Sequence, residues 1–463
     1  MSTEQLCETL ADWIASTRFE DLGDEVIAKT ISHIKDYIGV TIGGAVVESG
    51  VVARSVVRPW AHGECVVAGT DMRTSAPFAA WLNGISAHTL ELDDVHRGSI
   101  LHAGVAVIPA AMAVAETHGA TTRDLILAVA LGYEVMIRLG DAQLGKSNRK
   151  GFHTTGTCGS IAAAVAVAKI YELERKEIVS TIGLGASQSA GLLTFRTNGA
   201  WNKRLHAGHA AMSGVIAAAL AREKYYGPSE SLGGPDGWLQ AYAYENEYEP
   251  QRMTDRLGTH WLLLENSIKI HSCCRFAAPI VDATLAAVEK EDIQPEDVES
   301  VLVRMARYPL TRSLTEPKER KYRPLSVVDA QFSAPYAVAV ALVKRRAFLD
   351  EYSESAIRDP ALLDVAARVT WEVDPQAEKV WPHHYPCEVV ITRKGGSSLV
   401  SRIEWPKGDP ENPLTQKELN AKFYLLASPV LGHQKTEQVL TVLDDLDSHE
   451  VLVRDVAALF SVQ

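Results

Sequence analysis

Three segments of this 463-residue chain are almost wholly apolar and rich in alanine, and they constrain its fold more than any other feature: 105–115, 161–171 and 210–220. A helix that is apolar on every face is buried inside a protein. Small side chains also let neighbouring helices approach one another closely. We therefore predict that these segments are the core helices of a large, tightly packed helical domain.

The rest of the first 230 residues also has the pattern of successive helices. Apolar residues recur at helical spacing after an acidic start, after a proline that can begin a helix, and after a Thr-Thr-Arg-Asp run that can cap one. The helices predicted in this way cover residues 26–38, 77–85 and 125–137. A chain of this length is expected to form two or three domains.

The pattern changes near residue 270, where alternating and β-branched residues predict strands. One strand, a helix and three further strands are expected, and a Lys-Gly-Gly turn joins the last two strands. This order is typical of a small α+β domain. The predicted strands are 298–305, 367–373, 388–392 and 398–403, and the predicted helix is 334–345.

The domain boundaries follow from these patterns. Residues 1–268 are predicted to form a large all-helical domain, and residues 269–405 an inserted α+β domain. Residues 406–463 are predicted to return as helices to the first domain, after a Pro- and Gly-containing linker at 406–413. The predicted fold class is therefore mostly α.

Composition and charge exclude several classes of function. The formal net charge of −12 argues against non-specific binding to nucleic acid or to anionic membranes. The sequence shows no run of about 18 apolar residues, no signal-peptide pattern and no glycine-rich nucleotide motif. Its six scattered cysteines form neither zinc-ligand pairs nor a C-x-x-C motif. We expect a cytoplasmic protein with reduced thiols.

The first candidate site segment is residues 91–104, which join two apolar helical segments. Two adjacent carboxylates, Asp93 and Asp94, lie there with His96 and His102. A connection between helices does not need so many titratable groups. His102 precedes an apolar helix, whose N-terminus favours the neutral, basic form of an imidazole. The alternative is a solvated loop in which one of the two aspartates caps a helix.

The second candidate segment is residues 151–160. His153 and Thr154 lie there among Gly, Thr and Ser residues, just before an Ala-rich helix. Backbone amides and hydroxyl groups at such a helix start can hold a carboxylate. The alternative is an N-cap loop that contains an incidental histidine.

The third candidate segment is residues 201–209, where Lys203 and Arg204 precede another Ala-rich helix. A lysine supplies a point charge that suits a carboxylate. His206 and His209 are three residues apart and could form a metal pair, but the motif offers no third or fourth ligand. The alternative for the two basic residues is a solvated helix start.

The fourth candidate segment is residues 269–275, at the seam between the two predicted domains. His271 and Arg275 are four residues apart and could share one helix face toward an interdomain cleft, which is a preferred place for ligands. They could also be simple surface residues. Cys273 and Cys274 are predicted to be buried thiols rather than a redox pair.

These segments together resemble the MmgE/PrpD family, which includes 2-methylcitrate dehydratases, cis-aconitate decarboxylases and iminodisuccinate epimerases. The resemblance runs through "LELDDVHRGSILHAG", "GFHTTGTCGS", "KRLHAGHAA", "DAQFSAPYAVA" and "WPKGDPENPLT", in this order along nearly the whole chain. It implies a large helical domain, a smaller inserted lid domain, a homodimer, and a site between the domains that needs no metal or other cofactor.

The resemblance also assigns residues to that site. The pocket aspartate of the family falls on Asp93 or Asp94, and its histidines and lysine fall on residues of the other candidate segments: His102, His153, Lys203 and His271.

The chain departs from the family pattern at two points. Many relatives have a proline where this chain has Ala103. The decarboxylases and 2-methylcitrate dehydratases have an Asp-Thr-Trp or similar run, where this chain has Asp-Asp-Val-His at residues 93–96. The local pattern is closer to the poorly characterised members and to the epimerase-like branch.

The reaction we predict is the dehydration of a small hydroxy polycarboxylate, through negative charge on a carbon next to a carboxylate. The alternatives are an epimerase or isomerase of a dicarboxylate such as iminodisuccinate, a cis-aconitate decarboxylase-like enzyme, and a non-enzymatic binding protein. His102 and His153 are the expected base and acid, oriented by an aspartate. The residues expected to contact substrate are Asp94, His96, Thr154, Lys203, Arg204, His206 and Arg275.

Overall fold

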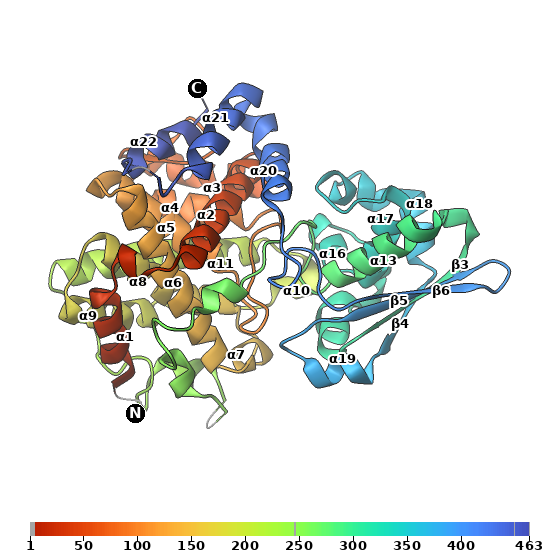
Figure 1. Cartoon of the computed structure of the whole chain (residues 1–463), viewed down its shortest axis with the longest axis horizontal. Helices are drawn as coiled ribbons and strands as arrows, with labels where there is room; N and C mark the ends of the chain where they lie inside the picture. Colours follow the sequence, from red (N-terminus) through yellow and green to blue (C-terminus); the bar gives the residue numbers. More distant parts are fainter. Residues whose placement is uncertain (1–4, 245–246, 449, 463) are drawn as a thin grey trace. The chain divides into compact units, whose positions relative to one another are not determined.

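The computed structural model describes residues 5–244, 247–448 and 450–462, and it is mostly helical (Figure 1). The chain divides into two compact units. Unit 1 comprises Met1–Leu193, Trp201–Asn266 and Thr415–Gln463, and unit 2 comprises Thr194–Ala200 and Ser267–Leu414. The two units therefore meet after residues 266 and 414, whereas the sequence predicted domain boundaries after residues 268 and 405.

The predicted linker at 406–413 is therefore part of unit 2 and not a solvated connection. Asp409 is buried there, and its carboxylate accepts hydrogen bonds from the Ser267 hydroxyl and, on both oxygens, from Nη2 of Arg275. The short segment Thr194–Ala200 also belongs to unit 2, where Phe195 lies 6.3 Å from Phe332, ring centre to ring centre.

Unit 1 is built from long helices, and each helix predicted from the sequence is confirmed. Thr121 caps α6 as predicted, since its hydroxyl accepts from the Asp124 amide while the Asp124 carboxylate accepts from the Thr121 amide. The helices of unit 1 are α1 (Leu6–Ser16), α2 (Asp24–Ala45), α3 (Glu48–Val57), α4 (Ala76–Ala87), α5 (Gly104–His118), α6 (Thr122–Ala142), α7 (Lys146–Arg149), α8 (Thr154–Ile170), α9 (Arg175–Ser187), α11 (Asn202–Arg222), α12 (Trp238–Tyr242), α20 (Gln416–Leu431), α21 (His433–Asp444) and α22 (Val453–Ala457).

The three Ala-rich segments form the centre of unit 1. Helix α8 packs against α5, α6, α9 and α11, and nearly all of its side chains are buried. The close approach depends on glycine where α4 crosses α11. A Cβ atom on Gly208 would overlap the carbonyl oxygen of Trp81, and one on Gly84 would lie 2.9 Å from the Gly208 Cα atom.

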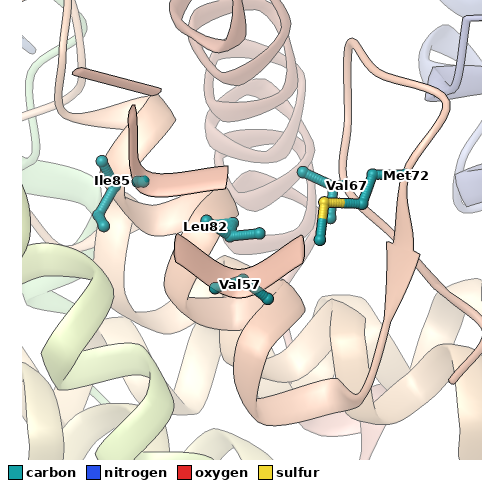
Figure 2. Close-up of a cluster of buried hydrophobic side chains, with 6 residues drawn as sticks. Val57, Val67, Met72, Leu82 and Ile85 are labelled. Atoms are coloured by element: carbon teal, nitrogen blue, oxygen red, sulfur yellow. The ribbon is translucent and has the colours of Figure 1, made fainter. Parts of the chain in front are cut away.

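Unit 1 is not all-helical, contrary to the prediction. Strands β1 (Cys65–Val66) and β2 (Arg73–Thr74) pair antiparallel between α3 and α4. Figure 2 shows the apolar cluster at this hairpin, in which Val67 and Met72 gather with Val57 of α3 and with two α4 residues, Leu82 and Ile85. The cluster anchors α4, and His88 follows directly after the last residue of that helix.

Unit 2 contains a four-stranded sheet in the order β4-β3-β5-β6. The predicted strands are confirmed as β3 (Val298–Met305), β4 (Val369–Val373), β5 (Cys387–Arg393) and β6 (Ser398–Ile403). Strand β4 runs parallel to β3, and the other neighbouring pairs are antiparallel. The β5–β6 turn is the predicted one, and its Gly395 and Gly396 both have positive φ angles, which a Cβ atom would strain.

The helices of unit 2 were predicted only in part. Helix α17 (Ala334–Lys344) is confirmed, whereas α13 (Ala278–Glu291), which packs against β5, β6 and α17, was not predicted. The remaining helices are short: α10 (Phe195–Asn198), α14 (Arg307–Pro309), α15 (Lys318–Tyr322), α16 (Val327–Gln331), α18 (Pro360–Ala366) and α19 (Pro375–Val380).

Two further predictions concern cysteines and membranes. All six cysteines are buried and have free thiols, including Cys273 and Cys274. Among the described helices, none is by itself long and apolar enough to cross a bilayer. One bent pair, Asp24–Ala45 with Glu48–Trp60 at 83°, passes that test on length and composition together.

The glycine contact between α4 and α11 makes a prediction. Gly208→Ala should destabilise the protein by about 1–3 kcal/mol, because the added methyl group would collide with backbone rather than with a movable side chain. Urea denaturation of both proteins measures the difference. Glu223→Ala, at the exposed end of the same helix, should stay within about 0.5 kcal/mol and serves as the control. Equal effects of the two substitutions would contradict the role of the contact.

Candidate functional site

The connection between α4 and α5 is a buried loop, not the solvated loop that was the alternative. Glu91, Asp93 and Asp94 are each 5% exposed or less. Glu91 and Ile100 have φ angles of 55° and 52°, a backbone conformation that costs about 1–3 kcal/mol for a non-glycine residue. Strain of this kind persists where the surrounding contacts hold it, and here it brackets the segment that carries both aspartates.

The Asp93 carboxylate lies between two imidazoles. Its Oδ2 atom is 2.7 Å from Nδ1 of His88 and 2.9 Å from Nδ1 of His102. The same His102 nitrogen is 2.7 Å from the backbone carbonyl oxygen of Asp94. An ionised carboxylate and a carbonyl only accept hydrogen bonds, so Nδ1 of His102 carries the hydrogen. In the neutral imidazole, Nε2 of His102 is then the basic nitrogen.

His88 supports this arrangement from inside the protein. Its ring centre is 4.8 Å from that of His102 and 5.7 Å from that of His153, with which it is nearly parallel. Burial lowers the pKa of His88 to about 4, although the neighbouring Asp93 charge acts in the opposite direction. His88 is therefore neutral near pH 7 and holds Asp93 by donating one hydrogen bond.

His153 is the residue just before α8, and its imidazole pairs with that of a second histidine. Its Nδ1 atom is 3.1 Å from Nδ1 of His206 on α11. Burial is the main cause that lowers the pKa of both imidazoles, to about 4 for His206. Two neutral imidazoles at this distance share one hydrogen, so one ring donates and the other accepts. His206, predicted to contact substrate, is here the partner of His153.

Lys203 brings a positive charge to the imidazoles. It lies in the first turn of α11 and forms an ion pair with Glu91, and both side chains are less than a tenth exposed. Burial is the largest cause of the lowered pKa of His88, of His153 and of His206, and the positive charge of Lys203 is a further cause for all three. The solvated helix start is thus excluded, and the predicted lysine lies in one cluster with the histidines.

Arg204 is also buried, and its side chain contacts helix α3. Its Nη1 atom donates to the Ser49 hydroxyl at 2.9 Å, at the start of α3. Its predicted contact with a substrate carboxylate stays a prediction.

Asp94 supports the loop from behind. Its Oδ1 atom accepts a hydrogen bond from the Gly104 amide at 3.1 Å, so Asp94 caps α5, as the alternative interpretation of this loop proposed. Its Oδ2 atom accepts from the Asn266 side chain. Burial, followed by the nearby charges of Asp93 and Asp36, raises the pKa of Asp94 to about 7.

Lys422 connects the loop to the C-terminal helices of unit 1. From α20 it donates to the Leu92 carbonyl oxygen at 2.6 Å, and it forms a buried ion pair with Asp36 of α2. The residue that precedes Asp93 is therefore held from a segment about 330 residues further along the chain.

Two other predicted site residues act within the loop. The Nδ1 atom of His96 is 3.1 Å from the Ser99 hydroxyl and accepts from the Ser99 amide at 3.2 Å. The Thr154 hydroxyl donates to the Ile100 carbonyl oxygen. Both contacts hold the shape of the loop, and neither links these side chains to the imidazole cluster.

His271 and Arg275 belong to unit 2, so their sharing a pocket with the imidazoles of unit 1 stays a prediction. His271 Nε2 is 2.7 Å from Asp282 Oδ1, and the other oxygen of Asp282 accepts from the Lys407 amide at 2.8 Å. Arg275 forms a forked contact with Asp409, at 2.6 and 2.7 Å. Its guanidinium is thus already paired with a carboxylate of the protein.

One group of residues has the ligand types for a metal. His88, Asp93 and His102 offer atoms that all lie within 4.8 Å of one another. Zinc needs its ligand atoms at about 2.0–2.2 Å from a common point. Here both imidazole nitrogens are at hydrogen-bond distance from the carboxylate itself, so the geometry suits proton transfer better than metal coordination.

Sequence reasoning missed several residues of these arrangements, among them His88, Glu91 and Asp282. His88 and Glu91 flank the quoted Asp-Asp motif, and the sequence signal was their nearness to it. Asp282 gave no such signal, because helix α13 was not predicted and the spacing of Asp282 from His271 has no meaning outside the folded unit.

The comparisons with known proteins agree along nearly the whole chain. Residues 8–251 match the MmgE/PrpD N-terminal domain, and residues 271–447 match the MmgE/PrpD C-terminal domain. A cis-aconitate decarboxylase-like protein of Aspergillus oryzae is 27% identical over 94% of this chain and 92% of its own length. Cis-aconitate decarboxylases of Aspergillus terreus and Mus musculus are 27% and 26% identical, over 96% and 98% of this chain and 93% and 94% of their own lengths.

The raised pKa of Asp94 makes a prediction about stability. Between its unfolded value of 3.8 and its folded value of about 7, the folded protein binds more protons, so the free energy of unfolding falls as pH rises through this range. Asp94→Asn has no titrating carboxyl group at this position and therefore lacks this pH-dependent loss of stability. The variant should gain stability relative to the parent protein between pH 5 and pH 7.5, measured by urea denaturation. A difference that does not change with pH would contradict the assignment.

Proposed function

The chain belongs to the MmgE/PrpD family, and we propose that it is a lyase that moves a proton on the carbon next to a carboxylate of a small polycarboxylic acid. The observation that carries the proposal is the contact of His102 Nδ1 with Asp93 and with the Asp94 carbonyl oxygen. These two acceptors present Nε2 of His102 as a base in a protected cluster.

His102 is the proposed general base. When its Nε2 atom takes a proton from carbon, the imidazole becomes positively charged, and the Asp93 carboxylate stabilises that charge through the bond to Nδ1. The Asp94 carbonyl oxygen adds a second acceptor for the same hydrogen. The ring therefore keeps both its tautomer and its orientation during the reaction.

Lys203 is the proposed partner of the substrate carboxylate. An ammonium group has three N–H donors, so Lys203 can bind Glu91 and a substrate oxygen at the same time. Removing the proton from carbon moves negative charge onto the adjacent carboxylate, and a fixed positive charge lowers the energy of that state. Glu91 positions the lysine for this purpose.

His153 is the proposed acid. If His206 donates the shared hydrogen, the proton of neutral His153 is on its Nε2 atom. That N–H can then donate to the oxygen of a leaving hydroxyl group. Because burial lowers the pKa of His153, the ring is neutral near pH 7, so it assists the departure of the hydroxyl group through this hydrogen bond and not as an imidazolium.

Dehydration of a hydroxy polycarboxylate is the reaction that we place first. The pair of imidazoles supports it, since one can remove a proton and the other can assist the departure of water. Decarboxylation is the second candidate, supported by the cis-aconitate decarboxylases that align with 96–98% of this chain. An epimerase would use the same proton removal but return the proton to the opposite face.

A hydrogen–deuterium exchange experiment tests the proposed function. The enzyme is incubated in deuterated buffer with 2-methylcitrate, citrate, cis-aconitate, iminodisuccinate or tartrate, and the products are followed by NMR. Dehydration gives a new double bond, decarboxylation releases CO₂, and epimerisation gives exchange without loss of a group. Absence of exchange and of product with every acid would contradict the proposal.

His102→Gln should lower kcat on the substrate so identified by about 10²–10⁴, the usual contribution of one acid–base group. His96→Gln is the matched control in the same loop, because its contacts are confined to Ser99 and the neighbourhood of Glu265. It should change kcat by less than about 10-fold. A His102 variant that keeps the full kcat would remove this residue from the mechanism.

His88 is a positioning residue, so its variants should separate according to their hydrogen-bond donors. His88→Leu removes the bond to Asp93 and should lower kcat by about 10–100-fold, as for other groups that orient a functional side chain, with a smaller change in KM. His88→Asn keeps an N–H donor near the same position and should retain more activity. Equal losses in the two variants would indicate a packing role alone.

A further inference from the structure

Unit 2 contains a small, positively charged hollow that the proposed mechanism does not use. It lies between α10, the π-helical segment Leu310–Leu314, α15 and α16. Its volume is about 10 Å³. This is room for roughly one water-sized group. Phe195 and Phe332 form apolar walls, and we call the site the basic hollow because Arg196, Arg312 and Lys321 line it.

Lys321 is the most unusual residue of the basic hollow. Its side chain is buried, with the residue 3% exposed, and its ammonium group has no hydrogen bond or ion pair with any described residue. Burial lowers the pKa of Lys321 to about 8, so the group is still mainly charged at pH 7. A charged group that is largely withdrawn from water is stabilised by an anion that pairs with it.

The nearest carboxylate is already occupied by another cation. Asp329 accepts hydrogen bonds from Arg320 Nε at 3.0 and 3.1 Å and from Arg320 Nη2 at 2.7 Å. It also accepts from the Ser326 hydroxyl at 3.0 Å and from the Leu325 amide at 3.3 Å. Asp329 therefore attracts Lys321 at a distance without bonding to it.

The two arginines also have donors that no described side chain occupies: those of Arg312 are exposed, and one of Arg196 is buried. The Nε atom of Arg196 is buried and has no hydrogen-bond partner in the described part of the chain, and no ion pair of Arg196 or Arg312 is present there. Counting these two arginines, Lys321 and Arg320 against Glu316 and Asp329 gives 4 − 2, a net charge of +2 around one small space.

We propose that the basic hollow is an anion site that takes a carboxylate group of a small organic acid. A carboxylate is flat and can insert one oxygen into a space of this size, and the lysine and arginine side chains supply the N–H donors that it needs. Phe195 and Phe332 give the contact two apolar walls. The inference depends on unit 2 alone and does not require the reaction proposed above.

Calorimetric titration of the full-length protein with tricarballylate tests the site. Lys321→Met keeps the length of the side chain and removes its charge, and it should weaken this binding at least 10-fold. Arg196→Gln should weaken it as well. Lys318→Met is the matched control on the same helix, because Lys318 is exposed and does not line the hollow, so its affinity should equal that of the parent protein.

Thermal unfolding without any added acid provides a second measurement that does not depend on ligand choice. Lys321→Met should raise Tm, since it replaces a charged group that burial disfavours with an apolar chain of similar volume. Tricarballylate should raise the Tm of the parent protein more than that of the variant. Equal affinity in the parent and Lys321→Met proteins, a lower Tm of the variant, or a Lys321-dependent response to inorganic phosphate but not to tricarballylate would overturn the proposal.

Discussion

The contacts of the Asp93 carboxylate with Nδ1 of His88 and Nδ1 of His102 are the interaction on which the candidate site depends. They determine the tautomer of His102, and through it the nitrogen that can act as a base. The loop that presents Asp93 is strained at Glu91 and at Ile100, and it is held by contacts from several helices. The position of the carboxylate between the two rings therefore depends on the packing of unit 1 around this loop.

The close packing of unit 1 comes from small residues. Helices that carry alanine and glycine at their contacts can cross at short distances, and α4, α8 and α11 each deliver a histidine or lysine to the cluster from such a crossing. The chain thus uses close backbone packing, rather than large side chains, to bring residues 88, 102, 153 and 203 together. A cluster assembled in this way tolerates little expansion of the core.

Much of this could be predicted from the sequence, for physical reasons. The Ala-rich segments and the helical periodicity identify the core helices, and alternation identifies the four strands of unit 2. His102, His153 and Lys203 could be predicted as site residues, because a polar residue just before an apolar helix can be recognised from the neighbouring sequence alone. Pairings could not be predicted, since the partners Glu91, His206 and Asp282 depend on which helices cross. For the α4–α5 loop, the sequence offered two interpretations, a helix cap and a functional site, and each describes one aspartate. Asp94 caps a helix, whereas Asp93 contacts the imidazoles.

The contact of Lys422 with the Leu92 carbonyl oxygen has a consequence for how the protein is made. A ribosome produces the α4–α5 loop early, but the helix that holds Leu92 follows some 330 residues later. A nascent chain interrupted before residue 416 would have its histidines and aspartates without the clamp on their loop. The organisation of unit 1 thus delays the final conformation of this loop until the late helices have been translated and have packed onto α2.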